Sequence, residues 1–238
     1  MTPDSFIHVP ELRDQITPFA HSVFRQDFPA FVRQLARDKG FDVSDLYDDA
    51  TRTALHDAFL ADHSGDLWVF AYGSLIWDPA LDFAQLRRAT VQGYARKMCL
   101  FDNKGARGSA AAPGLIAGLA PGDHCHGMAF LIPAERVADE TRYLWGREVI
   151  APGYLAQMLP AQTPQGPIDV LAFVADLSHD QIRPDLPADV QAHLVATGQG
   201  ELGSSFDYVK SIVDRFALLG IDDPDLSDLY QRARALRG

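Results

Sequence analysis

The sequence predicts an α+β fold, in which a small mixed, mostly antiparallel β-barrel or curved sheet is surrounded by helices and preceded by an N-terminal helical extension. Helical apolar spacing runs through the start of the chain and its last third, whereas short strand-like runs occupy residues 67–175. Regular crossover helices do not separate these runs, which argues against a doubly wound parallel sheet. We expect a helical extension over residues 1–65 and one α+β domain over residues 66–238.

Two helices are predicted in the N-terminal extension. The second fits residues 50–61, and Ser64-Gly65-Asp66 then interrupts the pattern. Apolar residues recur at helical spacing in the first, namely Phe28, Phe31, Val32, Leu35 and Ala36. The extension contains no residue pattern typical of catalysis.

The central region predicts strands joined by short loops. The first apolar run ends at Gly73-Ser74, where a turn is expected, and residues 105–113 are rich in small residues, which is typical of a loop. Pro133 precedes a predicted helix over residues 134–144. The predicted strands cover residues 67–72, 90–101, 115–119, 124–132, 154–159 and 168–175.

The last third predicts three further helices. Apolar residues recur three and four positions apart over residues 188–196, 205–219 and 225–236. Gly220 directly follows the middle helix, where a C-terminal capping residue is expected. Asp222-Asp223-Pro224-Asp225 fits a turn and helix N-cap better than a cation site, because it lacks the calcium-loop pattern.

The composition restricts the possible function classes. The chain has 238 residues, 47% of them hydrophobic, and a net charge of −11, which together indicate a globular protein that repels nucleic-acid backbones and anionic membranes. No apolar run is long enough to span a bilayer, and the N-terminal residues lack the pattern of a signal peptide. Cys99 and Cys125 belong to no CxxC pair, so we expect buried, reduced structural thiols and a cytoplasmic location.

Ala71-Tyr72-Gly73-Ser74-Leu75 is the first candidate functional segment. A strand that ends in a tight glycine turn can direct successive backbone N–H groups at one carboxylate or oxyanion. By spacing alone, an ordinary turn is the favoured interpretation, because isolated Gly-Ser turns are common. Ser74 is not predicted to be a nucleophile, because the segment departs from the G-x-S-x-G pattern of hydrolases.

Glu148 is the second candidate. If residues 147–150 enter a strand, Arg147 and Glu148 point to opposite faces and do not pair, and Glu148 shares a face with Ile150. A carboxylate in such apolar surroundings has a raised pKa, as a base that works near neutral pH requires. From the residues alone, a solvated surface glutamate is the competing interpretation.

His124 and His126 raise the question of a metal site. On a strand, the two side chains share one face, as two ligands would. A third ligand at a recognisable spacing is missing, so we expect no metal site and treat the pair as ordinary surface histidines.

Several separate stretches, in the same order along the chain, resemble the ChaC-type γ-glutamylcyclotransferases. The resemblance covers roughly residues 67–235. Ala71 and Ala106 depart from the family pattern, in which glycine and histidine are usual. The matching stretches are Val69 to Trp77 (F-G-Y-G-S-L-x-W), Gly93 to Arg96 (G-[YW]-x-R), Arg107 to Ser109 with Pro113-Gly114 (R-G-[ST]…P-G), Gly127 to Phe130 (G-V-A-[YF]), Leu144 to Glu148 with Gly153-Tyr154 (L-x-x-R-E, G-Y), and Gly203 to Val209 (G-x-x-x-[EQ]-Y-L).

The resemblance implies a γ-glutamylcyclotransferase-like domain, and a lyase that degrades glutathione to 5-oxoproline and cysteinylglycine without a cofactor. It implies Glu148 as the catalytic acid and base. Arg107 is implied to hold the glycine carboxylate of glutathione, and Tyr72 and Tyr208 to supply hydroxyl groups that donate hydrogen bonds to the substrate. The remaining implied substrate-binding residues form the strand and turn Val69, Phe70, Ala71, Tyr72, Gly73, Ser74 and Leu75.

Two alternatives to this function remain open from the sequence. One is a cyclotransferase that acts on other γ-glutamyl amino acids or amines. The other is a non-catalytic, transport-regulating binding protein, against which the presence of Glu148 argues. The oligomeric state is not predicted.

Overall fold

The computed structural model describes residues 4–40 and 42–238. Residues 1–3, part of the N-terminal stretch on which the expectation of no signal peptide depends, lie outside the described residues. The described residues form two compact units, one from residues 4–40 and 42–95 with Pro121–Val174 and the other from Arg96–Ala120 with Ala175–Gly238. This division follows contacts in space, and the domain boundary expected at residue 65 stays a prediction.

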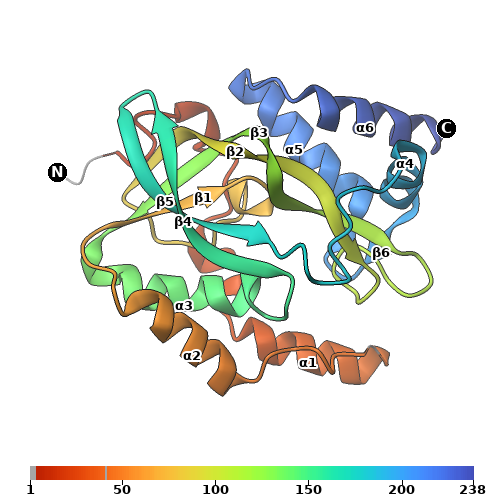
Figure 1. Ribbon diagram of the computed structural model, residues 1–238, viewed down its shortest axis with the longest axis horizontal. Coiled ribbons are helices and arrows are strands. Elements are labelled where there is room, and N and C mark those ends of the chain that lie inside the picture. The colour runs from red at the N-terminus through yellow and green to blue at the C-terminus, as the bar shows by residue number, and fades with distance from the viewer. Residues whose placement is uncertain (1–3, 41) are drawn as a thin grey trace. The chain divides into compact units, whose positions relative to one another are not determined.

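Five strands form a closed, mixed β-barrel, as the sequence predicts (Figure 1). Its order is β1-β3-β2-β4-β5, with a further pairing between β3 and β5. β1 runs antiparallel to β3 and parallel to β5, and β2 runs antiparallel to β4. The strands are β1 (Leu67–Ala71), β2 (Gln85–Asp102), β3 (Gly114–Ile132), β4 (Tyr154–Thr163) and β5 (Gly166–Ala175).

Close packing around β1 fixes where that strand ends. Val69 lies opposite Phe130 and Ala71 opposite Met128, and all four side chains are fully buried. Burial of a large apolar side chain contributes about 1.5–3 kcal/mol, so this register is strongly specified. A Cβ added at Gly127 would lie 2.3 Å from the Ala71 oxygen, so only glycine allows the two backbones to approach this closely.

The prediction of two strands over residues 115–119 and 124–132 is wrong, because β3 is one strand from Gly114 to Ile132. Pro121-Gly122, which reads as a turn in the sequence, lies inside it. A Cβ added at Gly122 would lie 2.4 Å from the Cβ of Ala95, which belongs to the neighbouring β2. Packing against a neighbouring strand keeps this stretch extended where local residue preference favours a turn.

The predicted N-terminal helices are present and belong to the first unit. α1 (Phe28–Lys39) and α2 (Asp49–Leu60) begin at Asp27 and Asp48, whose side chains accept the amides of Ala30 and Thr51. Both helices contact α3 (Val137–Glu148), beside which Figure 1 draws them. The 3-10 helices of this unit are η1 (Pro10–Leu12), η2 (Phe19–His21), η3 (Val23–Arg25), η4 (Ser74–Ile76) and η5 (Ala134–Arg136).

The second unit contains three mutually packed helices: α4 (Ala188–Thr197), α5 (Ser205–Leu219) and α6 (Pro224–Ala235). Gly220 ends α5 with a φ of 62°, and the Asp223 side chain caps α6 by accepting the Leu226 amide, as predicted. The same carboxylate pairs with Arg96, whose side chain is only 2% exposed. A short hairpin of β6 (Gln199–Gly200) and β7 (Gly203–Ser204) precedes α5.

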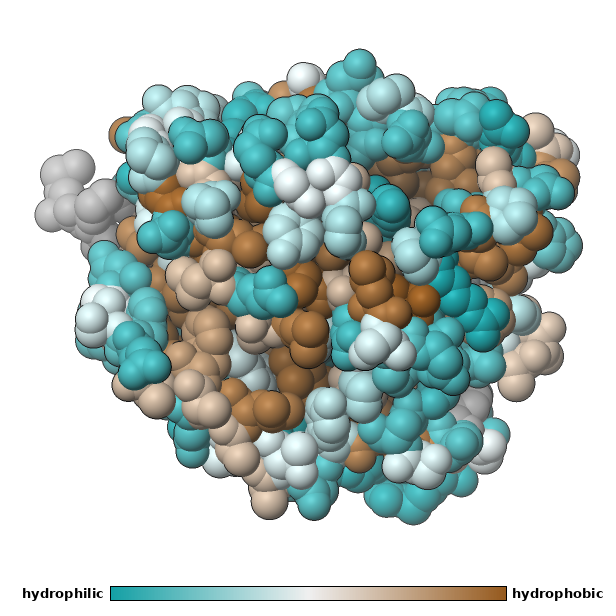
Figure 2. Space-filling model, viewed as in Figure 1, coloured by the Kyte–Doolittle hydropathy of each residue, from teal (hydrophilic) through white to brown (hydrophobic). Residues whose placement is uncertain are grey.

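Apolar side chains also reach the surface of the first unit. Figure 2 shows apolar residues gathered over the region where Figure 1 draws β4 and α3. On β4, the side chains of Leu155 and Met158 are 45% and 44% exposed, while Leu159 and Ala161 are buried. Within residues 4–40 and 42–238, no helix combines the length and apolar character needed to cross a membrane.

Candidate active site

The predicted binding segment spans the end of β1 and the turn that follows it. Val69, Phe70 and Ala71 have no exposed side-chain surface and Leu75 is 5% exposed, so these side chains pack in the core. Gly73 leads into η4, in which the amide of Ile76 donates to the Gly73 oxygen at 3.0 Å. The opening amides of a helix have no acceptor within it, so the main chain is the part of this segment suited to bind an anion.

Tyr72 is held by its hydroxyl group. The hydroxyl donates to the main-chain oxygen of Phe173 on β5 at 2.6 Å, and the residue is 6% exposed. A tyrosine hydroxyl has one proton to donate. In this structure the hydroxyl therefore ties the turn to β5.

Glu148 is the last residue of α3, so the assumption that residues 147–150 enter a strand is wrong. The helix continues past Leu144 because Leu144 and Trp145 are both buried, with the Trp145 ring 5.6 Å from that of Phe173. The prediction that Arg147 and Glu148 do not pair is also wrong. Arg147 Nε contacts Glu148 Oε1 at 2.9 Å.

Burial controls the charge of Glu148. Its side chain is 15% exposed and that of Arg147 is 5% exposed. Loss of solvation raises the pKa of the Glu148 carboxyl above its ordinary value, and the neighbouring Arg147 charge opposes the rise without cancelling it. The sequence-based expectation of a raised pKa is confirmed.

Arg147 links Glu148 to the predicted turn, a role that the sequence analysis missed. Its Nη2 donates to Ser74 Oγ at 2.8 Å, and its Nη1 donates to the main-chain oxygen of Asp78 just after η4. One guanidinium therefore contacts both the acid and the turn. The available signal was the adjacency of Arg147 and Glu148, because neighbours on a helix project about 100° apart, whereas neighbours on a strand point to opposite faces.

Arg107 and Tyr208 belong to the second unit, where they contact each other. The guanidinium carbon of Arg107 lies 5.3 Å from the centroid of the Tyr208 ring, and its Nη1 donates to the Leu202 oxygen. The Asp102 carboxylate accepts the amides of Arg107 and Gly108 and so fixes the loop. Their binding of substrate stays a prediction.

The other reactive residues have structural surroundings. The rings of His124 and His126 are 4.7 Å apart, and His126 Nδ1 is 2.8 Å from Thr90 Oγ1. Over the described part of the chain, no three or more His, Cys, Asp or Glu side chains gather in a group suited to hold a metal ion. Cys99 and Cys125 are buried, as predicted, and burial raises the pKa of the Cys99 thiol to about 11, which disfavours a nucleophilic role.

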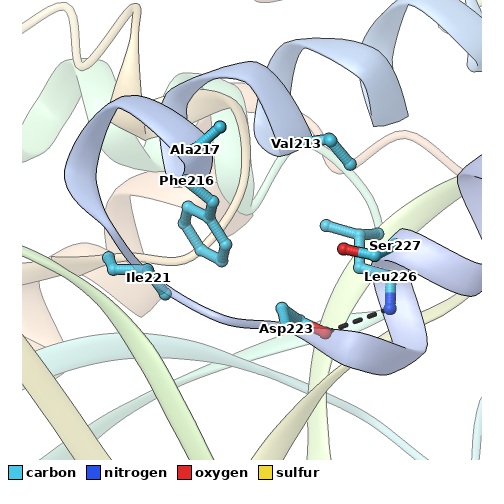
Figure 3. Close-up of a pocket in the computed structure, with 7 residues that line it drawn as sticks. All are labelled: Val213, Phe216, Ala217, Ile221, Asp223, Leu226 and Ser227. Atoms are coloured by element: carbon cyan, nitrogen blue, oxygen red, sulfur yellow. Dashed lines mark hydrogen bonds between the residues drawn. The ribbon is translucent and has the colours of Figure 1, made fainter.

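A cavity of about 110 Å³ lies between α5 and α6 in the second unit (Figure 3). Its lining is mainly apolar. The one carboxylate in it, that of Asp223, caps α6 and pairs with Arg96. The lining residues are Val213, Phe216, Ala217, Ile221, Asp223, Leu226 and Ser227, and none of them is a predicted site residue.

Comparisons with known proteins identify relatives of this arrangement. The family model described as ChaC-like protein matches residues 67–236. A glutathione-specific γ-glutamylcyclotransferase of Escherichia coli is 34% identical over 72% of this chain and 74% of its own length. A rat protein, glutathione-specific γ-glutamylcyclotransferase 1, is 31% identical over 65% of this chain and 71% of its own. The crystal structure of a glutathione-specific γ-glutamylcyclotransferase from yeast superposes with a TM-score of 0.67 at 20% identity, covering 73% of this chain and 98% of that one, which supports the fold.

Proposed function

Because the chain belongs to the ChaC-like protein family, we propose that it is a glutathione-specific γ-glutamylcyclotransferase. Two relatives that bear this name support the substrate, and they match about two thirds or more of the chain. We also propose a cytoplasmic location, which the acidic composition and the two buried free cysteines support.

The proposed reaction is an intramolecular exchange of one C–N bond for another. The α-amine of the γ-glutamyl group attacks its own γ-carbonyl carbon and closes a five-membered ring, and the bond to the cysteine nitrogen breaks. The proton lost by the amine balances the proton gained by the leaving nitrogen, so 5-oxoproline and cysteinylglycine form without the addition of water. Well-oriented intramolecular attack of this type reaches effective molarities of about 10⁵–10⁸ M.

Glu148 is the proton-transfer group in this proposal. It removes the proton from the α-ammonium and later delivers a proton to the leaving nitrogen. The observation that carries the proposal is a mostly buried carboxylate with a raised pKa that one arginine links to the glycine turn. A group that must both accept and donate works best with a pKa near the working pH, and such catalysis contributes about 10²–10⁴-fold.

The turn after β1 and Arg107 bind the substrate in this proposal. The main chain of the turn at Gly73 to Leu75 supplies N–H donors to the substrate's α-carboxylate or to the oxyanion. Tyr72 fixes that turn through its bond to β5. Arg107 holds the glycine carboxylate, a role suited to a guanidinium that the Leu202 oxygen and the Tyr208 ring orient.

The test is incubation of the purified protein with glutathione, with 5-oxoproline and cysteinylglycine measured by mass spectrometry. We expect equal amounts of both products from the wild type. Glu148→Gln should lower kcat by about 10²–10⁴-fold. Glu135→Gln, which changes an exposed glutamate of η5, is the matched control and should act as the wild type does.

Near-normal turnover by Glu148→Gln would remove Glu148 from the mechanism. An inert wild type would refute the proposed function itself. Specificity is tested with γ-glutamyl-alanine in the same assay. The proposal expects glutathione to be the better substrate, and a preference for γ-glutamyl-alanine would assign the chain to the broader class of cyclotransferases.

A further inference from the structure

The N-terminal segment, defined here as the described residues before Asp66, packs along the helix that ends in Glu148. The Trp145 ring of α3 lies 5.1 Å from the ring of His56 and 5.0 Å from that of Phe59. The amide of Tyr47 donates to the Ile150 oxygen at 2.9 Å. These contacts continue to the end of α3, so the segment reaches the part of the helix that carries the acid.

A second group of contacts joins η3 of this segment to α3. Arg25 Nη1 contacts the carboxylate of Glu140, which is 6% exposed, at 2.5 Å. The Arg25 guanidinium carbon lies 3.9 Å from the centroid of the Tyr143 ring. Removal of one partner of a buried ion pair strongly destabilises a protein. The pair of Arg25 and Glu140 therefore holds η3 against α3.

Phe24, the residue before Arg25, contacts the arginine next to the acid. The guanidinium carbon of Arg147 lies 3.8 Å from the centroid of the Phe24 ring, close enough for a cation–π contact. The edges of the same guanidinium contact Glu148 Oε1, Ser74 Oγ and the Asp78 oxygen. The guanidinium thus has polar partners at its edge and an aromatic ring against its face.

The planar guanidinium makes these contacts interdependent. Because its N–H groups have a fixed fork geometry, a rotation that keeps the bond to Ser74 but breaks the contact with Glu148 is not available without moving the whole group. The Phe24 ring restricts movement out of the plane and excludes water from that face. In such a poorly solvated site the attraction between Arg147 and Glu148 is stronger than in water.

We propose that Arg147 is a positioning residue that fixes the Glu148 carboxylate relative to the Ser74 turn, and that the N-terminal segment contributes to this positioning through the contact of Phe24 with Arg147. The inference rests on the proposed function, because it assigns a task to residues around the proposed acid. Arg147 contacts one oxygen of Glu148 and thereby orients the carboxylate, and Phe24 holds Arg147.

Substitutions of Phe24 in the full chain test the contribution of the N-terminal segment. Phe24→Leu keeps an apolar side chain but removes the ring, and it should lower kcat about 3–10-fold with KM within about twofold. Phe24→Tyr keeps the ring and should retain wild-type kcat. Phe31→Leu is the matched control, since Phe31 lies in the same segment, is 40% exposed and stacks on Phe28. It should leave kcat unchanged.

Substitutions of Arg147 test the positioning role with a readout that simple loss of packing does not move. Arg147→Lys retains the charge but not the fork, and should lower kcat roughly 10–100-fold. Arg147→Met removes the charge that opposes the raised pKa of Glu148. The acid limb of its kcat/KM profile for glutathione should therefore move up by about one pH unit or more.

Circular dichroism and thermal melts establish that each variant is folded at the assay temperature. Equal kcat values for Phe24→Leu and Phe31→Leu in folded proteins would overturn the role of Phe24, and an unmoved acid limb in Arg147→Met would overturn that of Arg147. If Arg147→Met does not fold, the kcat of Arg147→Lys tests the role of Arg147, and the kcat values of Phe24→Leu and Phe24→Tyr test the role of Phe24. An active wild type with unaffected variants refutes this inference alone, whereas an inert wild type refutes the proposed function.

Discussion

Replacement of Tyr72 by phenylalanine separates a structural role of its hydroxyl from a substrate-binding one. The hydroxyl is buried and donates to the Phe173 oxygen at 2.6 Å. Loss of a buried hydrogen bond that leaves one partner behind costs about 1–3 kcal/mol. For a chain of this size the melting temperature should fall by roughly 2–4 °C per kcal/mol, so we expect Tyr72→Phe to melt about 2–12 °C below the wild type.

The assay combines a thermal melt with steady-state kinetics on glutathione well below the melting temperature. Because the proton of the hydroxyl is engaged with β5, the folded variant should keep kcat/KM within about threefold of wild type. Tyr94→Phe is the matched control, because its hydroxyl makes only a 3.3 Å contact with Gln157. A fall in kcat/KM of about 10²-fold without a change in melting temperature would refute this reasoning and show that the hydroxyl binds the substrate.

Four further predictions use other parts of the structure. The raised pKa of Glu148 means that kcat/KM is retained above that pKa and lost below it, so the acid limb should lie above the value of about 4.3 for an ordinary glutamate. The folded state binds this proton more tightly than the unfolded chain, so the associated stability is present at low pH and lost as pH rises. The unfolding free energy of Glu148→Gln, relative to wild type, should accordingly increase with pH in urea titrations. Gly127→Ala places a methyl group 2.3 Å from the Ala71 oxygen, and it should destabilise the protein by about 1–3 kcal/mol and lower activity through β1, which urea midpoints and turnover check. Arg107→Lys loses bidentate recognition and should raise KM for glutathione about tenfold at nearly constant kcat, and an unchanged KM would contradict the proposed role.

Local sequence patterns predict most elements of this fold because their causes are local. The helix predicted over residues 205–219 has the bounds of α5, where Ser204 caps the start and Gly220 the end. Both signals, a side chain that accepts an opening amide and a residue that adopts positive φ, act within a few residues. The antiparallel character of the barrel also follows from strand-like runs that no crossover helices separate.

The errors occur where distant contacts override local preference. Pro121-Gly122 is a turn signal, yet its packing beside Ala95 keeps β3 continuous. Gly146, a residue type common at helix ends, lies inside the last turn of α3. Strand-like residues at Val149 and Ile150 therefore suggested a strand that burial of Trp145 against Phe173 excludes. The sequence identified Glu148 as the candidate acid, but not the partner that orients it, since Ser74 and Phe24 are remote from Arg147 in the chain.

The helical position of Glu148 has a chemical consequence that a strand would lack. The C-terminal end of an α-helix carries a partial negative charge from its unsatisfied carbonyl groups, which disfavours a carboxylate there. This effect acts in the same direction as burial, so both favour the protonated form of Glu148. The partial negative charge of the helix end favours the positive charge of Arg147, which lies in the same last turn. That positive charge opposes the rise in the pKa of Glu148. Burial acting alone would raise the pKa of Glu148 further and make its carboxylate harder to keep ionised. Arg147 acting alone would lower that pKa and make the carboxyl a weaker proton donor. The proposed mechanism uses one group both to accept and to donate a proton, and the end of α3 supplies two opposing influences on its pKa.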